Sequence, residues 1–206
     1  MSTISEAIIN SLKRVPLDLG QGNLRTTTKG KLIALSLVRD GHGKKALDVG
    51  AREGAQTRWL QARGYEVTSI DVESLFPECL QVDANKPLPF EDARFDLIWS
   101  SEVIEHLEDP AAALSELRRV TKPGGELILT TPNSYAFLFR LLSLVGLTPQ
   151  RIQRKDHLHF FDADDIKRLA PDAELYGYFP YMLVRRCIRR GIGQLSPTFV
   201  MHIHKR

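Results

Sequence analysis

Short apolar runs alternate with amphipathic segments along most of the chain. Apolar or β-branched runs predict strands at 45–50, 65–72, 80–82, 95–100 and 126–131. Apolar residues at helical spacing predict helices at 29–40, 55–64 and 110–121. Two more strands are predicted around 173–179 and at 198–205. Because continuously apolar strands that alternate with helices form parallel sheets covered on both faces, the pattern predicts an α/β fold: a doubly wound, seven-stranded, mostly parallel sheet with an antiparallel last strand.

The elements are expected to form one domain over residues 1–206, because 206 residues are too few for two independent cores of typical size. Residues 1–43 are predicted to form an N-terminal helical cap. It begins with a capping-box pattern at Thr3 and Glu6, and Pro16 ends its first helix. Residues 44–134 hold the regular alternation of strands and helices, and residues 135–206 supply an insertion and the closing strands.

Composition excludes several classes of protein. A hydrophobic content of 43% is far above the disordered range, and two cysteines without metal-binding spacing, Cys79 and Cys187, are expected to be reduced thiols. The N-terminus lacks the pattern of a signal peptide. The longest apolar run, at 135–147, is interrupted by Arg140 and is shorter than the roughly 20 residues that span a bilayer. The expected location is therefore cytoplasmic.

The net charge of +3 conceals an uneven distribution. Residues 1–137 contain 16 Lys and Arg against 19 Asp and Glu, whereas residues 138–206 contain 12 against 6. Helical spacing within 182–193 would place Arg185, Arg186, Arg189 and Arg190 in two adjacent rows, which either face solvent or contact an anionic membrane surface. Residues 133–161 mix aromatic with basic residues and form either the wall of an apolar pocket or ordinary packing on the sheet.

Acidic residues and glycines gather where the predicted strands end. The first strand runs into the loop from Asp48 to Gly54, the second ends at Asp71, and the third is followed by Asp83. In an open α/β sheet, ligands bind at the carboxyl ends of the strands. A dinucleotide fingerprint needs glycines at relative positions 0, 2 and 5, whereas Gly50 and Gly54 are four apart, so a dehydrogenase is disfavoured. Asp48 either contacts the ligand or orients the loop by hydrogen bonds.

Four motifs in order resemble class I S-adenosylmethionine-dependent methyltransferases, which have a Rossmann-like fold. They are LDVGAREG, SIDVE, VDANKPLPFEDARFDLIWSSEVIEHLEDP and TKPGGELILTTPN. The resemblance implies S-adenosylmethionine as cofactor, with Gly50 and Gly54 around its methionine part, Asp71 on the ribose and Asp83 with Ala84 at the adenine. The cofactor-binding residues expected in this way are Asp48, Gly50, Ala51, Gly54, Asp71, Val72, Asp83, Ala84 and Ser100.

The chain departs from the family pattern in two places. Arg52 stands where the family usually has glycine, so we expect its backbone to avoid positive φ. Its side chain is expected to point away from the cofactor or, alternatively, to form a salt bridge with the substrate or near Glu53. Only 11 residues separate Asp71 from Asp83, too few for the helix that the family usually carries there. That side of the cofactor site should be thin and open.

The stretch Glu102-Val103-Ile104-Glu105-His106 is the sharpest chemical pattern. If it is helical, Glu102, Glu105 and His106 share one face and could hold a cation such as Mg²⁺. The pattern resembles the metal-binding set of ubiquinone-pathway and small-RNA 2′-O-methyltransferases, and this resemblance implies His157 as the fourth ligand. In the alternative, Glu102 caps and His106 packs under the sheet, and His157 or His106 is the catalytic base. His159, His202 and His204 are expected to be structural.

These observations predict an S-adenosylmethionine-dependent methyltransferase that methylates a hydroxyl of a small-molecule, glycan or lipid-linked acceptor. A catalytically silent cofactor-binding or assembly module is one alternative, made conceivable by Arg52 and the missing helix. An RNA 2′-O-methyltransferase is another. Nucleic acid ranks below a small or lipid-linked partner because no RNA-binding module is appended. The sequence does not determine the oligomeric state.

Overall fold

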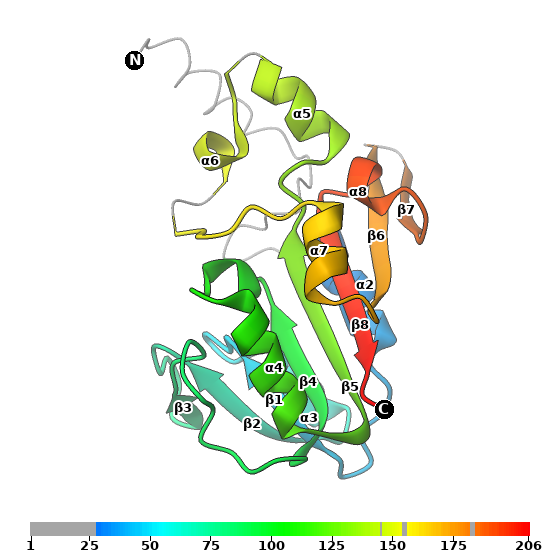
Figure 1. Ribbon diagram of the computed structural model, residues 1–206. Helices are drawn as coiled ribbons and strands as arrows, with labels where there is room; N and C mark the ends of the chain where they lie inside the picture. Colours follow the sequence, from blue (N-terminus) through cyan, green and yellow to red (C-terminus); the bar gives the residue numbers. More distant parts are fainter. Residues whose placement is uncertain (1–27, 145, 154–155, 182–183) are drawn as a thin grey trace.

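The computed structural model of the protein describes residues 28–144, 146–153, 156–181 and 184–206, and the predicted first helix lies outside them. Its helices, with one short 3-10 turn η1, are α2 Lys29–Leu37, α3 Ala55–Ala62, η1 Ile104–His106, α4 Pro110–Val120, α5 Phe137–Leu144, α6 Pro149–Ile152, α7 Ala163–Leu169 and α8 Ile192–Leu195 (Figure 1). Its strands are β1 Lys45–Val49, β2 Glu66–Asp71, β3 Cys79–Gln81, β4 Phe95–Ser101, β5 Thr121–Pro132, β6 Glu174–Tyr181, β7 Val184–Ile188 and β8 Thr198–His204.

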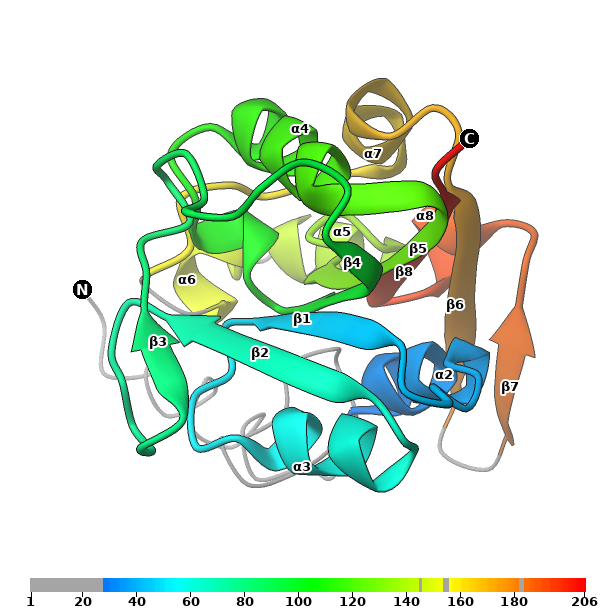
Figure 2. The same ribbon diagram turned by 90° about the horizontal axis from the view of Figure 1, so that it is seen from below.

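The strands form one sheet in the order β3-β2-β1-β4-β5-β8-β6-β7. The first five run parallel, and β8 is antiparallel to both β5 and β6. Helices α4 and α7 cover one face, and α2 and α3 cover the other (Figure 2). This arrangement confirms the predicted α/β class, the mostly parallel sheet and the antiparallel last strand.

The sheet has eight strands among the described residues rather than the predicted seven. The additional strand, β7, pairs with β6 through residues that were expected to form an arginine-rich helix. The two helical rows of arginines therefore do not form, because strand pairing supersedes the local helical spacing. Arg189 binds the Glu174 carboxylate, with 2.6 Å between nitrogen and oxygen, and lies over the Tyr176 ring, so part of the basic charge is neutralised within the protein.

Two apolar clusters fix the layers. One packs α4 and α7 on the sheet and includes Leu117, Ile166 and Phe199, and the other packs α2 on the opposite face and includes Ile33 and Val200. Adjacent residues of β8 thus enter different clusters, so both faces of this strand, which lies between β5 and β6, are buried. No helix among the described residues is both long enough and apolar enough to cross a membrane.

Candidate active site

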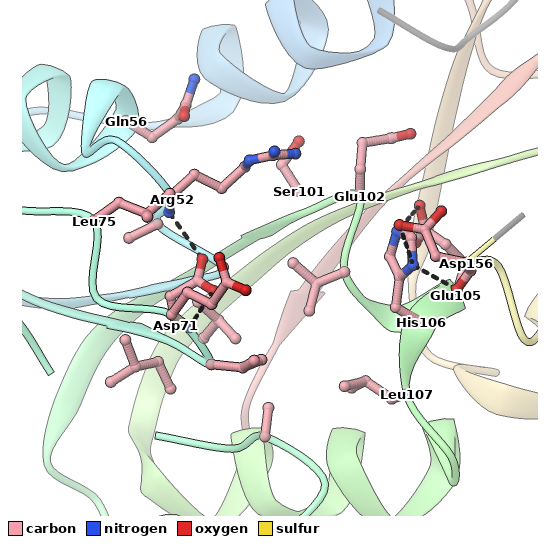
Figure 3. Close-up of a pocket in the computed structure, with 18 of the residues that line it drawn as sticks. Arg52, Gln56, Asp71, Leu75, Ser101, Glu102, Glu105, His106, Leu107 and Asp156 are labelled. Carbon is pink, nitrogen blue, oxygen red and sulfur yellow. Dashed lines mark hydrogen bonds and ion pairs between the residues drawn. The ribbon is translucent and has the colours of Figure 1, made fainter. Parts of the chain in front are cut away.

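A cleft of about 520 Å³ opens at the carboxyl ends of β1, β2 and β4 (Figure 3). The strand order reverses between β1 and β4, so the cleft lies at the topological switch point where open α/β sheets bind ligands. Its volume falls in the range of small-molecule sites, roughly 300–1,000 Å³. Of the cofactor-binding residues expected from sequence, the cleft is lined by Gly50, Ala51, Asp71, Val72 and Ala84.

The loop after β1 is tied to the end of β2. The N–H groups of Gly50 and Ala51 donate to the Ile70 carbonyl, and the Arg52 N–H donates to the Asp71 carboxylate at 2.9 Å. The other Asp71 oxygen accepts from the Glu73 N–H at 3.2 Å. Asp71 therefore holds the loop in place while its carboxylate borders the cleft.

Asp48 and Gly54 lie just behind the cleft lining. Asp48 is buried and accepts a hydrogen bond of 2.6 Å from the Thr57 hydroxyl, which connects β1 to α3. Burial raises the pKa of Asp48 to about 6, against the opposing effects of the Thr57 hydrogen bond and the Lys31 charge. Asp48 does not line the cleft, and its side-chain hydrogen bond goes to α3 rather than to the loop after β1. Gly54 has φ of 76° and precedes α3.

The backbone conformation of Arg52 differs from the one predicted for a residue other than glycine. Its φ is 49°, in the left-handed region that we expected a non-glycine residue to avoid, and its side chain lines the cleft instead of pointing away from it (Figure 3). Such a conformation costs roughly 1–2 kcal/mol. In this conformation the Arg52 N–H donates to the Asp71 carboxylate, and this tertiary contact offsets the local preference.

The side of the cleft formed after β2 is thin, as predicted. Residues 72–78 connect β2 to β3 without a helix, and Val72 and Leu75 line the cleft while remaining 61% and 49% exposed. Asp83 does not line it, because its carboxylate turns back to the Asn85 N–H and to Lys86. Ser100 is buried beneath, and the next residue, Ser101, borders the cleft instead.

Sequence reasoning missed the contribution of the helical cap and of α3. Thr28 and Lys31, at the start of α2, and Gln56, in α3, also line the cleft. Burial lowers the pKa of Lys31, while Glu102 and Asp48 act in the opposite direction. No motif marks Thr28 and Lys31, because α2 reaches the cleft only by packing, whereas Gln56 follows the loop after β1 directly at the start of α3.

The predicted helical face at Glu102, Glu105 and His106 does not form. Glu102 has φ of 59° and is followed by Val103 and the 3-10 turn η1, so the two carboxylates diverge. Glu102 accepts a hydrogen bond from the Thr130 hydroxyl at 2.9 Å, and Glu105 is buried and accepts one from the Thr131 hydroxyl at 3.0 Å. Glu102 therefore stands apart from the other predicted ligands.

The remaining three predicted ligands do come together. Ligand atoms of Glu105, His106 and His157 lie within 4.8 Å of one another, and the two imidazole rings meet edge to face at 4.8 Å between centroids. The Glu105 carbonyl accepts from the N–H groups of Leu158 and His159, which fastens the segment after α6 to η1. Residues about 50 positions apart thus form one wall of the cleft.

Gly50 offers a test of how tightly the loop is packed. A Cβ at this position would lie 2.4 Å from Cγ2 of Val103, at a φ of 74°. We expect Gly50→Ala to lower the free energy of unfolding by roughly 2–4 kcal/mol, measured by urea denaturation. Gly43→Ala is the control, because φ there is 79° and nothing lies within 4 Å, so it should lose only about 1–2 kcal/mol. Equal losses in the two variants would contradict the close contact.

Two similarities decide the family. A family model described as a methyltransferase domain matches residues 47–129. The ubiquinone biosynthesis O-methyltransferase of Azoarcus sp. strain BH72 is 30% identical over 159 residues, which cover 66% of this chain and 67% of that relative. The chain belongs to the class I S-adenosylmethionine-dependent methyltransferases.

Other similarities support membership of the same family. The malonyl-[acyl-carrier protein] O-methyltransferase of Erwinia billingiae is 36% identical over 98 residues, which cover 43% of this chain and 39% of that relative. The crystal structure of an S-adenosylmethionine-dependent methyltransferase from Mesorhizobium loti superposes with a TM-score of 0.65 over 85% of this chain and 97% of that chain. At 14% sequence identity, that likeness shows the shared fold. The chain thus spans 39% and 67% of the two curated relatives.

Proposed function

We propose that this methyltransferase transfers a methyl group from S-adenosylmethionine to a hydroxyl oxygen of a small-molecule acceptor, with His106 as the base. The observation that carries the proposal is the position of His106 on the wall of the cleft, with Nδ1 bonded to the Asp156 carbonyl at 2.9 Å. Because a carbonyl only accepts, Nδ1 carries the proton in the neutral ring. Nε2 then holds the lone pair that can take a proton from an acceptor hydroxyl.

The cleft residues fit the cofactor. Asp71 offers two carboxylate oxygens at the end of β2, which suits a ribose diol, and Val72 and Leu75 supply apolar surface for a base. Lys31 and Arg52 bring two cationic side chains to the same cleft, which suits the carboxylate of the methionine part. When bound, S-adenosylmethionine supplies a methyl group already activated on a sulfonium. The protein therefore needs to align the acceptor oxygen and remove its proton.

The divergence of Glu102 favours a base over the expected Mg²⁺ site. The group that remains, Glu105, His106 and His157, has one carboxylate and two imidazoles, whereas Mg²⁺ prefers oxygen ligands. We therefore expect methyl transfer to persist within twofold after treatment with EDTA. Loss of activity in EDTA that is restored by Mg²⁺ would show that a cation, and not His106 alone, activates the acceptor.

The acceptor is proposed to carry an apolar portion. Helix α5, which follows β5 beyond the carboxyl ends of the strands (Figure 1), exposes four large apolar side chains. They are Phe137, Leu138, Leu141 and Leu144, and Leu144 is 82% exposed. Arg140 is exposed in the same helix. A hydroxylated ring or glycan on a lipid-like tail matches this combination of apolar and cationic surface beyond the ends of the strands.

Labelled methyl transfer tests the proposal. The protein is incubated with methyl-labelled S-adenosylmethionine and, in turn, a catechol, a phenol with an isoprenoid tail, a malonyl thioester and a short RNA. We expect the tailed phenol to be labelled at least tenfold faster than the thioester or the RNA. If the protein binds S-adenosylhomocysteine but labels neither these compounds nor any component of a cell extract, it is a silent cofactor-binding module and the proposal is wrong.

A further inference from the structure

A second group of histidine and carboxylate side chains lies far from the cleft, at the opposite end of the sheet. In the antiparallel ladder of β5 and β8, Glu126 pairs directly with His204, and His202 is two residues away on the same strand. Because side chains alternate along a strand, these three residues project from one face of the sheet. Thr130, which pairs with Ser101 at the cleft, is four residues along β5 from Glu126, or about 13 Å at 3.3 Å per residue.

The carboxylate of Glu126 contacts both imidazoles. His202 Nε2 is 3.0 Å from one carboxylate oxygen, and His204 Nδ1 is 4.0 Å from the other. The ligand atoms of all three residues lie within 4.8 Å of one another, and the two ring centroids are 4.2 Å apart. His202 is buried, whereas the side chain of His204 is 48% exposed. The cluster is therefore rigid on one side and open to solvent on the other.

The donor set identifies the kind of ion that fits. Two imidazoles and one carboxylate are the protein ligands of many zinc sites, which complete four-coordination with water or another ligand. Imidazole nitrogens suit Zn²⁺ and its neighbours among the transition metals, whereas Mg²⁺ and Ca²⁺ take oxygen ligands. Two histidines at i and i+2 on a strand, with a carboxylate directly across the ladder, offer these donors at short range.

The charges around Glu126, His202 and His204 offset one another, so a metal ion would be held there mainly by direct bonds to the three side chains. Glu174 lies on β6 opposite His202 of β8 and interacts electrostatically with both histidines. Its carboxylate also binds Arg189 and the Tyr176 hydroxyl. Arg39 adds a positive charge that acts on Glu126. Arg39 and Arg189 offset the charges of Glu126 and Glu174. The electrostatic potential alone would therefore not attract cations to the site.

We propose that Glu126, His202 and His204 form a binding site for a divalent transition-metal ion, with Zn²⁺ as its preferred ion. The metal would join β5 to β8 through side chains and leave at least one coordination position open at the His204 side. Because it would bind only the paired strands, it would stabilise the folded state. Its effect is separate from methyl transfer, since the site lies at the other end of the sheet from the cleft.

Calorimetry and thermal unfolding with ZnCl₂ test this site. We expect wild-type protein to bind Zn²⁺ with a micromolar dissociation constant. At a hundredfold excess over that constant, the melting temperature should rise by about 5–10 °C, reversibly on adding EDTA. His204→Ala, at an exposed position, should weaken binding at least tenfold and abolish the shift, and Glu126→Gln should do the same. MgCl₂ at equal concentration should produce no shift.

Two control variants separate this site from other histidines. His106→Ala disrupts the cluster in the cleft, and His42→Asn removes an exposed histidine while keeping a residue that tolerates its φ of 48°. Both are expected to keep the Zn²⁺-induced shift. The proposal is overturned if His204→Ala binds Zn²⁺ as tightly as wild type, or if His106→Ala alone abolishes the shift.

Discussion

Replacing Asp71 with alanine is expected to weaken binding of S-adenosylhomocysteine at least thirtyfold in calorimetry. Asp71 is the acid that both borders the cleft and accepts the N–H groups of Arg52 and Glu73. A hydrogen bond to a charged group contributes roughly 1.5–3 kcal/mol, and loss of two such bonds from a ribose diol corresponds to this factor or more. Asp71→Asn keeps one oxygen acceptor and should fall between wild type and alanine.

Asp83→Ala is the matched control for this experiment. Asp83 also follows a strand end, but its carboxylate binds the Asn85 N–H and Lys86 and does not line the cleft. We expect the dissociation constant of S-adenosylhomocysteine for Asp83→Ala to stay within threefold of that for the wild type. Thermal unfolding of both variants separates loss of binding from loss of folding. Equal weakening by the two substitutions would mean that Asp71 has no special contact with the cofactor.

Replacing His106 with alanine is expected to lower kcat for methyl transfer 100-fold or more, while the dissociation constant of S-adenosylhomocysteine changes less than threefold. General-base catalysis typically contributes 10²–10⁴-fold, and Nε2 of His106 is the nitrogen without a hydrogen in the neutral ring when Nδ1 donates to the Asp156 carbonyl. The measurement uses whichever acceptor is labelled in the methyl-transfer assay. His157 packs against His106, so His157→Ala should lower the rate less, through loss of positioning.

His159→Ala is the control for His106. His159 lies in the same segment as His157, but its Nε2 is 3.3 Å from the Glu108 carbonyl and its ring stacks on Phe161. We expect it to retain at least half of the wild-type rate. A full rate in His106→Ala would remove His106 from the reaction and leave alignment of the acceptor as the main source of catalysis.

The class of fold could be predicted from sequence because it depends on local periodicity. Apolar strands alternating with amphipathic helices can bury their surfaces only in a parallel sheet covered on both faces, and the structure confirms this. The last strand was likewise predicted to be antiparallel, whereas its place between β5 and β6 could not be predicted from its own residues. The short connection from Asp71 to Asp83 predicted the open side of the cleft, because chain length alone excludes a helix there.

Predictions failed where pairing with another segment outweighs the preference of a residue's own type or spacing. Arg52 was expected to avoid positive φ, but the bond from its N–H to Asp71 holds it there. The arginines of 182–193 have helical spacing, yet residues 184–188 pair with the edge of β6 as the strand β7. Local patterns carry no information about which edge or acceptor is nearby, and a contact between distant segments can supply the 1–2 kcal/mol that a strained residue needs.

The sequence by itself determined the order of elements from β1 to β5, the edge of the sheet where the cleft opens and the acid at the end of β2, because each follows from spacing along one segment. Only the tertiary structure decided which side chains meet. It separated Glu102 from Glu105, joined His106 to His157 and brought Lys31 of the helical cap into the cleft. It also placed Glu126 against two histidines nearly 80 positions away. These contacts depend on strand register and helix docking, which follow from packing of the whole chain.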